Sequence, residues 1–252
     1  MSVTYDVRNG VAWLTINRPD ARNSLNQAVR DGLFEGVRRF NGDGAAKVLV
    51  LTGAGDRAFC AGGDLKEMSA EELTIPPVDF VPQFGRNIVV DKPTIAAVNG
   101  VAFAGGFLLA QTCDLCVAAT TAQFGITEAR VGRGSPWAAP LPLMIPRRVA
   151  LELTLTGAPL TAQRAYEIGF VNRLAEPGDL VETTQTLAEQ IAANAPLSVA
   201  AGKRTASLTA EYPLSEAFDQ AEKIWAPVYL SGDAQEGMAA FAEKRAPVWK
   251  GM

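Results

Sequence analysis

Short apolar runs in the first half of the chain predict buried β-strands separated by helices. Val3–Asp6 and Val11–Ile16 flank the turn residues Asn9-Gly10 and predict a β-hairpin. From Ser24, the expected N-cap, to Phe40, apolar residues recur at helical spacing and predict a helix. Further strands are expected at Lys47–Thr52, Thr94–Val98 and Leu115–Ala118, and further helices at Asp64–Met68 and Gly105–Thr112.

Strands and helices alternate, with roughly 40–50 residues for each strand–strand–helix unit, which favours an α/β fold with parallel strand pairing. From Leu151 onward the pattern becomes helical. We place a boundary near residue 195, so that residues 1–195 form the α/β core and residues 196–252 a helical C-terminal region. The helices expected after the change are Leu151–Thr156, Thr161–Ile168, Asp179–Asn194, Leu197–Thr209, Leu214–Tyr229 and Asp233–Arg245.

Composition narrows the class of protein. The chain has 252 residues, of which 48% are hydrophobic, enough for a sizeable core. A formal net charge of −4 argues against a nucleic-acid-binding surface. No apolar run is long enough to predict a membrane span, and Met1–Asp6 lacks the features of a signal peptide. We therefore expect a cytoplasmic protein that binds neither nucleic acid nor membrane.

The chain contains no histidine. This excludes a Ser–His–Asp triad, a Cys–His pair and the common histidine-ligated metal sites, so no metal is expected. A general acid or base must then be a carboxyl group, lysine, tyrosine, cysteine or water. The three cysteines, Cys60, Cys113 and Cys116, match no disulfide framework and are expected to be buried thiols.

Two glycine-rich turns carry the candidate chemistry. Ala61-Gly62-Gly63-Asp64 follows an apolar strand and precedes a helix, and Ala104-Gly105-Gly106 repeats this arrangement on the next unit. Glycine allows a sharp turn and close approach of a ligand, and a helix N-terminus offers free N–H groups. Two such turns are suited to hold an oxygen anion, and Glu128 follows them as a candidate base.

At these residues the chain resembles the crotonase family, the enoyl-CoA hydratase/isomerase superfamily. Residues 59–68 (FCAGGDLKEM) are similar to the family pattern FxAGxDLKEM, and residues 92–114 to KPxIAAVNGxAxGGGxxLAxxCD. Residues 122–132 (AQFGITEARVG) are similar to AxFxxPExxxG. Family motifs also match residues 17–26 near the start and residues 243–251 near the end, so the resemblance covers nearly the whole chain.

The resemblance implies a crotonase-like ββα superhelix with a C-terminal helical trimerisation region, assembled as a homotrimer or hexamer. It implies an acyl-CoA substrate and no separate cofactor. The N–H groups of Gly63 and Gly105 would hold the thioester oxygen, and Glu128 would be the acid/base. Substrate contacts are implied for Arg22, Ala61, Asp64, Leu65, Lys66, Leu108, Trp137 and Lys244.

Leu108 departs from the pattern of the family's hydratases, which carry a glutamate there. With one glutamate at 128, the site is more similar to the family's Δ3,Δ2-enoyl-CoA isomerases, in which a single carboxylate moves a proton between the α and γ carbons. The alternatives are an enoyl-CoA hydratase of fatty-acid β-oxidation type and a non-catalytic acyl-CoA-binding homologue.

Residues 132–140 (GRGSPWAAP) form a second departure, because the family commonly has GxxPGxGGTQRL there. In the family this segment helps to shape the acyl pocket, so Trp137 is a candidate to line or cap it. Arg133, in the same segment, is expected to face solvent.

Overall fold

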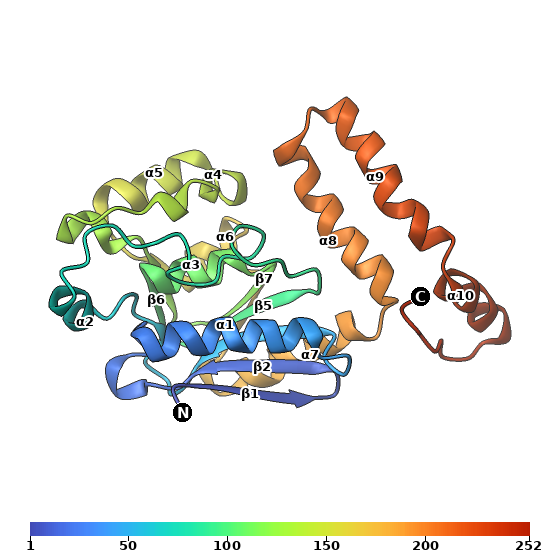
Figure 1. Ribbon diagram of the computed structural model, residues 1–252, viewed down its shortest axis with the longest axis horizontal. Coiled ribbons are helices and arrows are strands. Elements are labelled where there is room, and N and C mark those ends of the chain that lie inside the picture. The colour runs from blue at the N-terminus through green and yellow to red at the C-terminus, as the bar shows by residue number, and fades with distance from the viewer.

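Two β-sheets form the centre of the protein, whose computed structural model describes residues 1–252 (Figure 1). The larger sheet has the order β1-β2-β3-β5-β7-β10 and the smaller one the order β4-β6-β8-β9. The strands of the larger sheet are β1 Val3–Arg8, β2 Val11–Ile16, β3 Val48–Gly53, β5 Thr94–Val98, β7 Leu115–Ala119 and β10 Arg173–Ala175. Those of the smaller sheet are β4 Ala58–Cys60, β6 Val101–Phe103, β8 Gln123–Gly125 and β9 Leu160–Thr161.

Strand pairing is parallel except at one edge of each sheet. In the larger sheet β1 and β2 form the predicted hairpin, whose turn residues Asn9 and Gly10 both have positive φ. All its other pairs are parallel, which confirms the predicted α/β class. In the smaller sheet β4, β6 and β8 are parallel and β9 pairs antiparallel with β8, a strand that the apolar pattern does not reveal.

Successive units of the chain contribute one strand to each sheet and then turn into a helix. The first unit is β3, β4 and α2 (Leu65–Ala70), and the second is β5, β6 and α3 (Gly105–Thr112). The third is β7, β8 and the 3₁₀ turn η2 (Thr127–Val131). Because β4, β6 and β8 are parallel neighbours, their carboxyl ends meet at one edge of the smaller sheet. Both glycine turns and Glu128 follow these ends.

Helix α1 (Gln27–Gly42) packs on β1 and β2, while α7 (Leu180–Ala192) packs across β3, β5 and β7. The N-cap of α1 is Asn26, whose side chain accepts a hydrogen bond from the Val29 N–H at 3.1 Å. The prediction of Ser24 as the cap was therefore wrong. The helix begins later because Leu25 first pairs with the glycine turn, its N–H donating to the Gly62 carbonyl at 2.9 Å.

The C-terminal region is helical, as the sequence predicted. Figure 1 shows α8 and α9 as an antiparallel pair that projects away from the sheets, followed by α10. No helix has the length and apolar character needed to cross a membrane. The domain boundary at residue 195 and the oligomerisation role stay predictions. The remaining elements are α4 Leu141–Met144, α5 Arg147–Thr156, α6 Ala162–Glu167, α8 Pro196–Glu211, α9 Leu214–Tyr229, α10 Gly232–Glu243, η1 Pro19–Ala21, η3 Pro136–Ala138 and η4 Pro177–Asp179.

Candidate active site

A cavity of about 690 Å³ lies where β4, β6 and β8 end. It brings together residues that are far apart in the sequence but follow neighbouring strands. The predicted site residues that line it are Ala61, Gly63, Leu65, Gly105, Leu108, Glu128 and Trp137. Glu128 is the only acidic residue of the lining.

The two glycine turns touch each other. Gly62 has a φ of +100°, a conformation that L side chains rarely adopt. A Cβ atom added to Gly62 would lie 2.9 Å from the Cβ of Ala104 and 3.5 Å from the nitrogen of Gly105. Glycine at 62 is therefore required both by its own backbone and by the close approach of the second turn.

Each turn presents an N–H group without a partner in the chain. Gly105 is the first residue of α3, so its N–H has no helical acceptor. Gly63 lies in the bridge to Leu25, but the hydrogen bonds of that bridge are made by its neighbours Gly62 and Asp64. Two free N–H groups on adjoining turns, one of them at a helix N-terminus, can bind a negatively charged oxygen.

Glu128 is held from the side by Trp137. It lies on η2 and is only 8% exposed. The indole N–H of Trp137 donates to Oε1 of Glu128 at 3.0 Å, whereas Oε2 is buried and has no hydrogen-bond partner. Burial raises the pKa of the Glu128 carboxyl, and the hydrogen bonds from its own N–H and from Trp137 only partly oppose this.

Trp137 is itself fixed by α3. Its carbonyl accepts a hydrogen bond from Nε2 of Gln111 at 2.9 Å, and its ring meets Phe107 edge to face with 6.0 Å between centroids. Phe107 packs in turn against Phe124 and Phe170. The same helix that supplies the Gly105 N–H therefore sets the position of the partner of Glu128.

Leu108 occupies the position at which the hydratases that the chain resembles carry a second glutamate. It lies three residues after Gly105, so it is on the same face of α3, and it is 6% exposed. Because its side chain is a hydrocarbon, Leu108 supplies no acid or base that could activate a water molecule.

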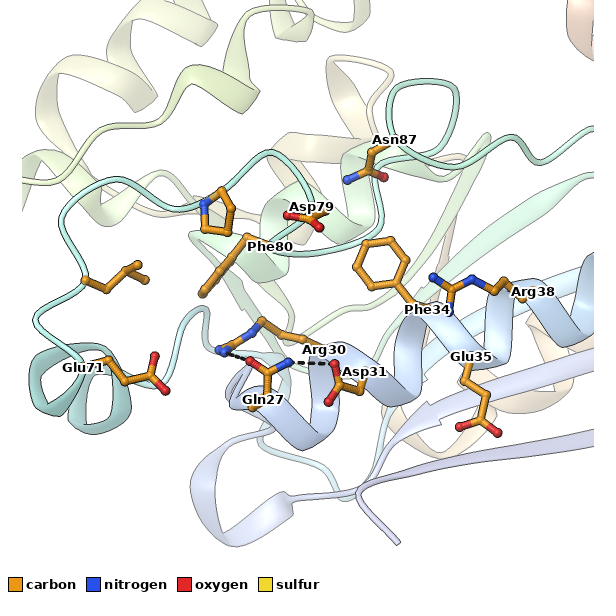
Figure 2. Close-up of a pocket in the computed structure, with 12 residues that line it drawn as sticks. Gln27, Arg30, Asp31, Phe34, Glu35, Arg38, Glu71, Asp79, Phe80 and Asn87 are labelled. Atoms are coloured by element: carbon orange, nitrogen blue, oxygen red, sulfur yellow. Dashed lines mark hydrogen bonds between the residues drawn. The ribbon is translucent and has the colours of Figure 1, made fainter.

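Part of the cavity wall is a loop that packs against α1. Pro76, Val78 and Phe80 of this loop line the cavity. Figure 2 shows a neighbouring pocket, between this loop and α1, in which Arg30 lies beneath Phe80. The Arg30 guanidinium lies 4.4 Å from the centroid of the Phe80 ring and donates to Glu67 of α2 at 2.8 Å.

The other predicted substrate contacts do not line this cavity. Arg22 and Lys66 are exposed, and Lys244 is the exposed residue that ends α10. Asp64 caps α2 by accepting from the Glu67 N–H and pairs with Arg18 at 3.1 Å. Its carboxylate therefore has a structural role in the first glycine turn.

Arg133 differs from expectation, because it is partly buried and lines the cavity instead of facing solvent. Its Nη1 donates to the carbonyl of Leu73 at 2.9 Å. No sequence signal distinguishes this arginine from the exposed Arg130. Gly132, whose backbone is left-handed, ends the 3₁₀ turn just before Arg133, and the contact with the Leu73 carbonyl fixes the direction of the side chain.

The three cysteines are buried and free, as predicted. Burial raises the pKa of the Cys60 thiol to about 12, so this group is neutral although it adjoins the first glycine turn. The thiols belong to the core.

Comparison with known proteins agrees with the fold and identifies the family. A family model described as enoyl-CoA hydratase/isomerase matches residues 6–252. The chain is 38% identical over 261 residues to (E)-benzylidenesuccinyl-CoA hydratase of Thauera aromatica, with 100% of both chains covered. It is 38% identical over 255 residues to carnitinyl-CoA dehydratase of Salmonella typhi, with 97% of both covered.

Solved structures extend the agreement to three dimensions. An enoyl-CoA hydratase from Mycobacterium marinum has a TM-score of 0.89 and 42% identity, covering 100% of this chain and 99% of its own. One from Bacillus anthracis has a TM-score of 0.91 and 32% identity, with 100% of both chains covered. These matches confirm the predicted crotonase-like α/β fold. The chain therefore belongs to the enoyl-CoA hydratase/isomerase family of enzymes.

Proposed function

We propose that this enzyme moves the double bond of a 3-enoyl-CoA thioester into the 2,3 position, with Glu128 as the single acid and base. The observation that carries the proposal is the cavity lining, in which Glu128 is the only carboxyl group and Leu108 stands near it. Since one carboxyl group suffices for a proton shuttle and a second would be needed to hold the water of a hydration, the lining favours isomerisation.

In the proposed reaction the Glu128 carboxylate removes a proton from C2 of the substrate. The electron pair of that C–H bond forms the C1–C2 double bond of a dienolate, whose negative charge rests on the thioester oxygen. The N–H groups of Gly63 and Gly105 stabilise this oxygen, and losing one such donor typically costs about 3–4 kcal/mol. Glu128 then returns the proton to C4, and the double bond closes between C2 and C3.

The arrangement around Glu128 suits this shuttle. Burial raises its pKa, which makes the carboxylate a stronger base than an exposed glutamate. Trp137 holds Oε1 and leaves Oε2 without a partner, so one oxygen is available for the proton. An oxygen fixed beside a flat dienolate reaches C2 and C4 from the same side, because these two carbons are separated by a single atom.

The CoA part of the substrate is assigned to the surface beside the first glycine turn. Ala61 and Leu65 line the cavity there. The carbonyl of Arg22 accepts a hydrogen bond from the Ala61 N–H at 3.0 Å, and Lys66 follows the turn in the sequence, so both exposed cations lie on the chain next to it. Lys244 lies at the far end of α10 and would serve the cavity of a neighbouring subunit in a homotrimer or hexamer. Basic side chains of this kind suit the phosphates of CoA.

Hydration is the second candidate, because the relatives of known name are called hydratase and dehydratase. The experiment that separates the two supplies 3-hexenoyl-CoA and 2-hexenoyl-CoA to the purified protein in turn. The proposal expects isomerisation of the first to exceed hydration of the second by about 100-fold. Fast hydration of 2-hexenoyl-CoA that persists in Glu128→Gln would overturn the one-base mechanism.

A further inference from the structure

The cavity contains more positive charge than its one carboxyl group balances. Arg86, Arg130 and Arg133 all line it, and none of them takes part in an ion pair. Arg86 and Arg130 are exposed and form part of its rim, whereas Arg133 is partly buried. A cavity for a purely hydrocarbon acyl chain has no use for a guanidinium group among its apolar side chains.

Arg133 is anchored to the same turn as Glu128. Its backbone N–H donates to the carbonyl of Glu128 at 2.9 Å, so Arg133 is fixed to the end of the 3₁₀ turn that carries Glu128. Both of them line the cavity, together with Leu108 and Trp137. A group bound by Arg133 would therefore lie in the same cavity as the carbon atoms on which Glu128 acts.

The guanidinium of Arg133 is only half satisfied. Nη1 donates to the Leu73 carbonyl, but Nη2 is buried and has no hydrogen-bond partner. Buried donors without partners are rare in proteins, because each forfeits its hydrogen bonds to water. A carboxylate in the cavity matches the planar fork of a guanidinium: it supplies the missing charge and, after a small rotation of the side chain toward the cavity, an acceptor for Nη2.

We infer that the acyl group of the natural substrate carries a carboxylate at the end remote from the thioester, and that Arg133 binds this carboxylate. The inference rests on the proposed function for the position of the thioester and deepens it by naming the substrate class, a dicarboxylic acyl-CoA. Arg86 and Arg130 add positive potential at the rim, which attracts such a substrate.

Phosphate groups of CoA have the same anionic chemistry and are the other source of a partner for Arg133. Its partly buried place beside Leu108 and Glu128 favours the acyl end, since the candidate phosphate-binding residues Arg22 and Lys66 are exposed. The affinities of saturated thioesters and of free CoA distinguish an acyl carboxylate from a CoA phosphate as the partner of Arg133. Saturated thioesters are suitable because they bind without reacting.

Calorimetric titration would compare hexanedioyl-CoA, hexanoyl-CoA and free CoA, with the four- and eight-carbon pairs added to cover chain length. We expect the wild type to bind one diacid thioester about tenfold or more tightly than its monoacid partner. Arg133→Gln should abolish this preference, because it should weaken binding of the diacid thioester much more than binding of the monoacid thioester or free CoA. Arg133→Lys should retain part of it, and Arg148→Gln, an exposed arginine of α5, should retain all of it.

The inference fails if the wild type binds the diacid thioester no more tightly than the monoacid thioester at every chain length. This result uses the wild type alone and does not depend on whether a variant folds. It also fails if Arg133→Gln weakens free CoA and both thioesters equally, since the partner would then be a phosphate. Neither result depends on turnover. A diacid preference in a protein that does not isomerise enoyl thioesters would overturn the proposed reaction and leave this inference standing.

Discussion

Among the single residues of the site, Trp137 has the most specific influence on Glu128. Its indole N–H is a hydrogen-bond donor to the ionised carboxyl group and so favours the charged form. Burial acts in the opposite direction and is the larger effect, because the pKa of Glu128 is raised. The basicity of Glu128 thus depends on two opposed effects, burial, which raises its pKa, and the hydrogen bond from Trp137, which lowers it.

Replacing Trp137 with Phe should move the pH profile of the enzyme upward. The variant keeps an aromatic ring against Phe107 but loses the donor, so the pKa of Glu128 rises further. Glu128 must be ionised to act as a base, and therefore the ascending limb of kcat/KM against pH should shift to higher pH. A profile measured on 3-hexenoyl-CoA over the acid and neutral range would show this.

The matched control is Trp13→Phe, which also removes an indole hydrogen bond, to Gln185 at 2.7 Å, in a tryptophan of β2 that does not line the cavity. Its limb should stay at the wild-type position. A Trp137→Phe limb that stays in place or moves to lower pH would show that the hydrogen bond does not stabilise the carboxylate.

Ala104 shows strain that a substitution can relieve. It has φ of 51° and ψ of −120°, a backbone conformation that favours glycine, and it caps α3 at the second turn. Ala104→Gly should therefore raise the free energy of unfolding by about 1 kcal/mol. Urea unfolding would measure this change.

The control is Ala102→Gly in β6, where φ is negative, which should lower the free energy of unfolding instead. A destabilised Ala104→Gly would mean that the Cβ packing against Gly62 outweighs the strain.

Whole helices and strands were predictable where the apolar residues recur with a clear helical or strand pattern. The strand Thr94–Val98 and the helix Gly105–Thr112 have the predicted bounds. The sequence did not reveal that β4, β6 and β8 belong to a second sheet. A three-residue apolar run has the same sequence pattern whichever sheet its strand joins. Family motifs located Gly63, Gly105 and Glu128, whereas Arg133 escaped because tertiary packing alone directs its side chain.

Helix α1 and the loop around Phe80 depend on each other through Arg30. Arg30→Met should remove the ion-pair partner of Glu67, which keeps only the Gln27 N–H, and should free the Phe80 ring, at a cost of about 2 kcal/mol or more. Since Phe80 lines the cavity, the KM for the enoyl thioester should rise more than kcat falls. Steady-state kinetics combined with amide hydrogen exchange of residues 71–83 would show both effects.

The control for this variant is Arg38→Met on the same helix. Arg38 is exposed and stacks on Phe34 instead. The Arg38→Met variant should alter neither the KM for the enoyl thioester nor the amide hydrogen exchange of residues 71–83. Unchanged loop exchange in Arg30→Met would show that the loop is held by its own contacts.

The molecule as a whole exposes more apolar surface than a monomer needs, and much of it lies on the last helices. Phe218 is 65% exposed, Leu230 87% and Phe241 89%. Large exposed apolar patches commonly mark protein interfaces. Together with the projecting pair α8 and α9 in Figure 1, this supports assembly through the C-terminal region.

The family resemblance implies a homotrimer or hexamer, so light scattering should give three or six times the mass of one chain. Phe218→Asp places a charge on the exposed face of α9 and should lower the measured mass. Asp219→Ser, at the next and also exposed position, should not. A wild-type protein that runs as a monomer would contradict the proposed assembly and the reach of Lys244 to a neighbour.

One rate decides whether Glu128 alone moves the proton. It is the kcat of Glu128→Gln for conversion of 3-hexenoyl-CoA to 2-hexenoyl-CoA, measured with hexanoyl-CoA binding as the check on the fold. Glutamine keeps the shape and accepts the Trp137 hydrogen bond but cannot take a proton, so kcat should fall about a thousandfold while hexanoyl-CoA still binds. Retention of more than about a tenth of the wild-type kcat would show that another group carries the proton.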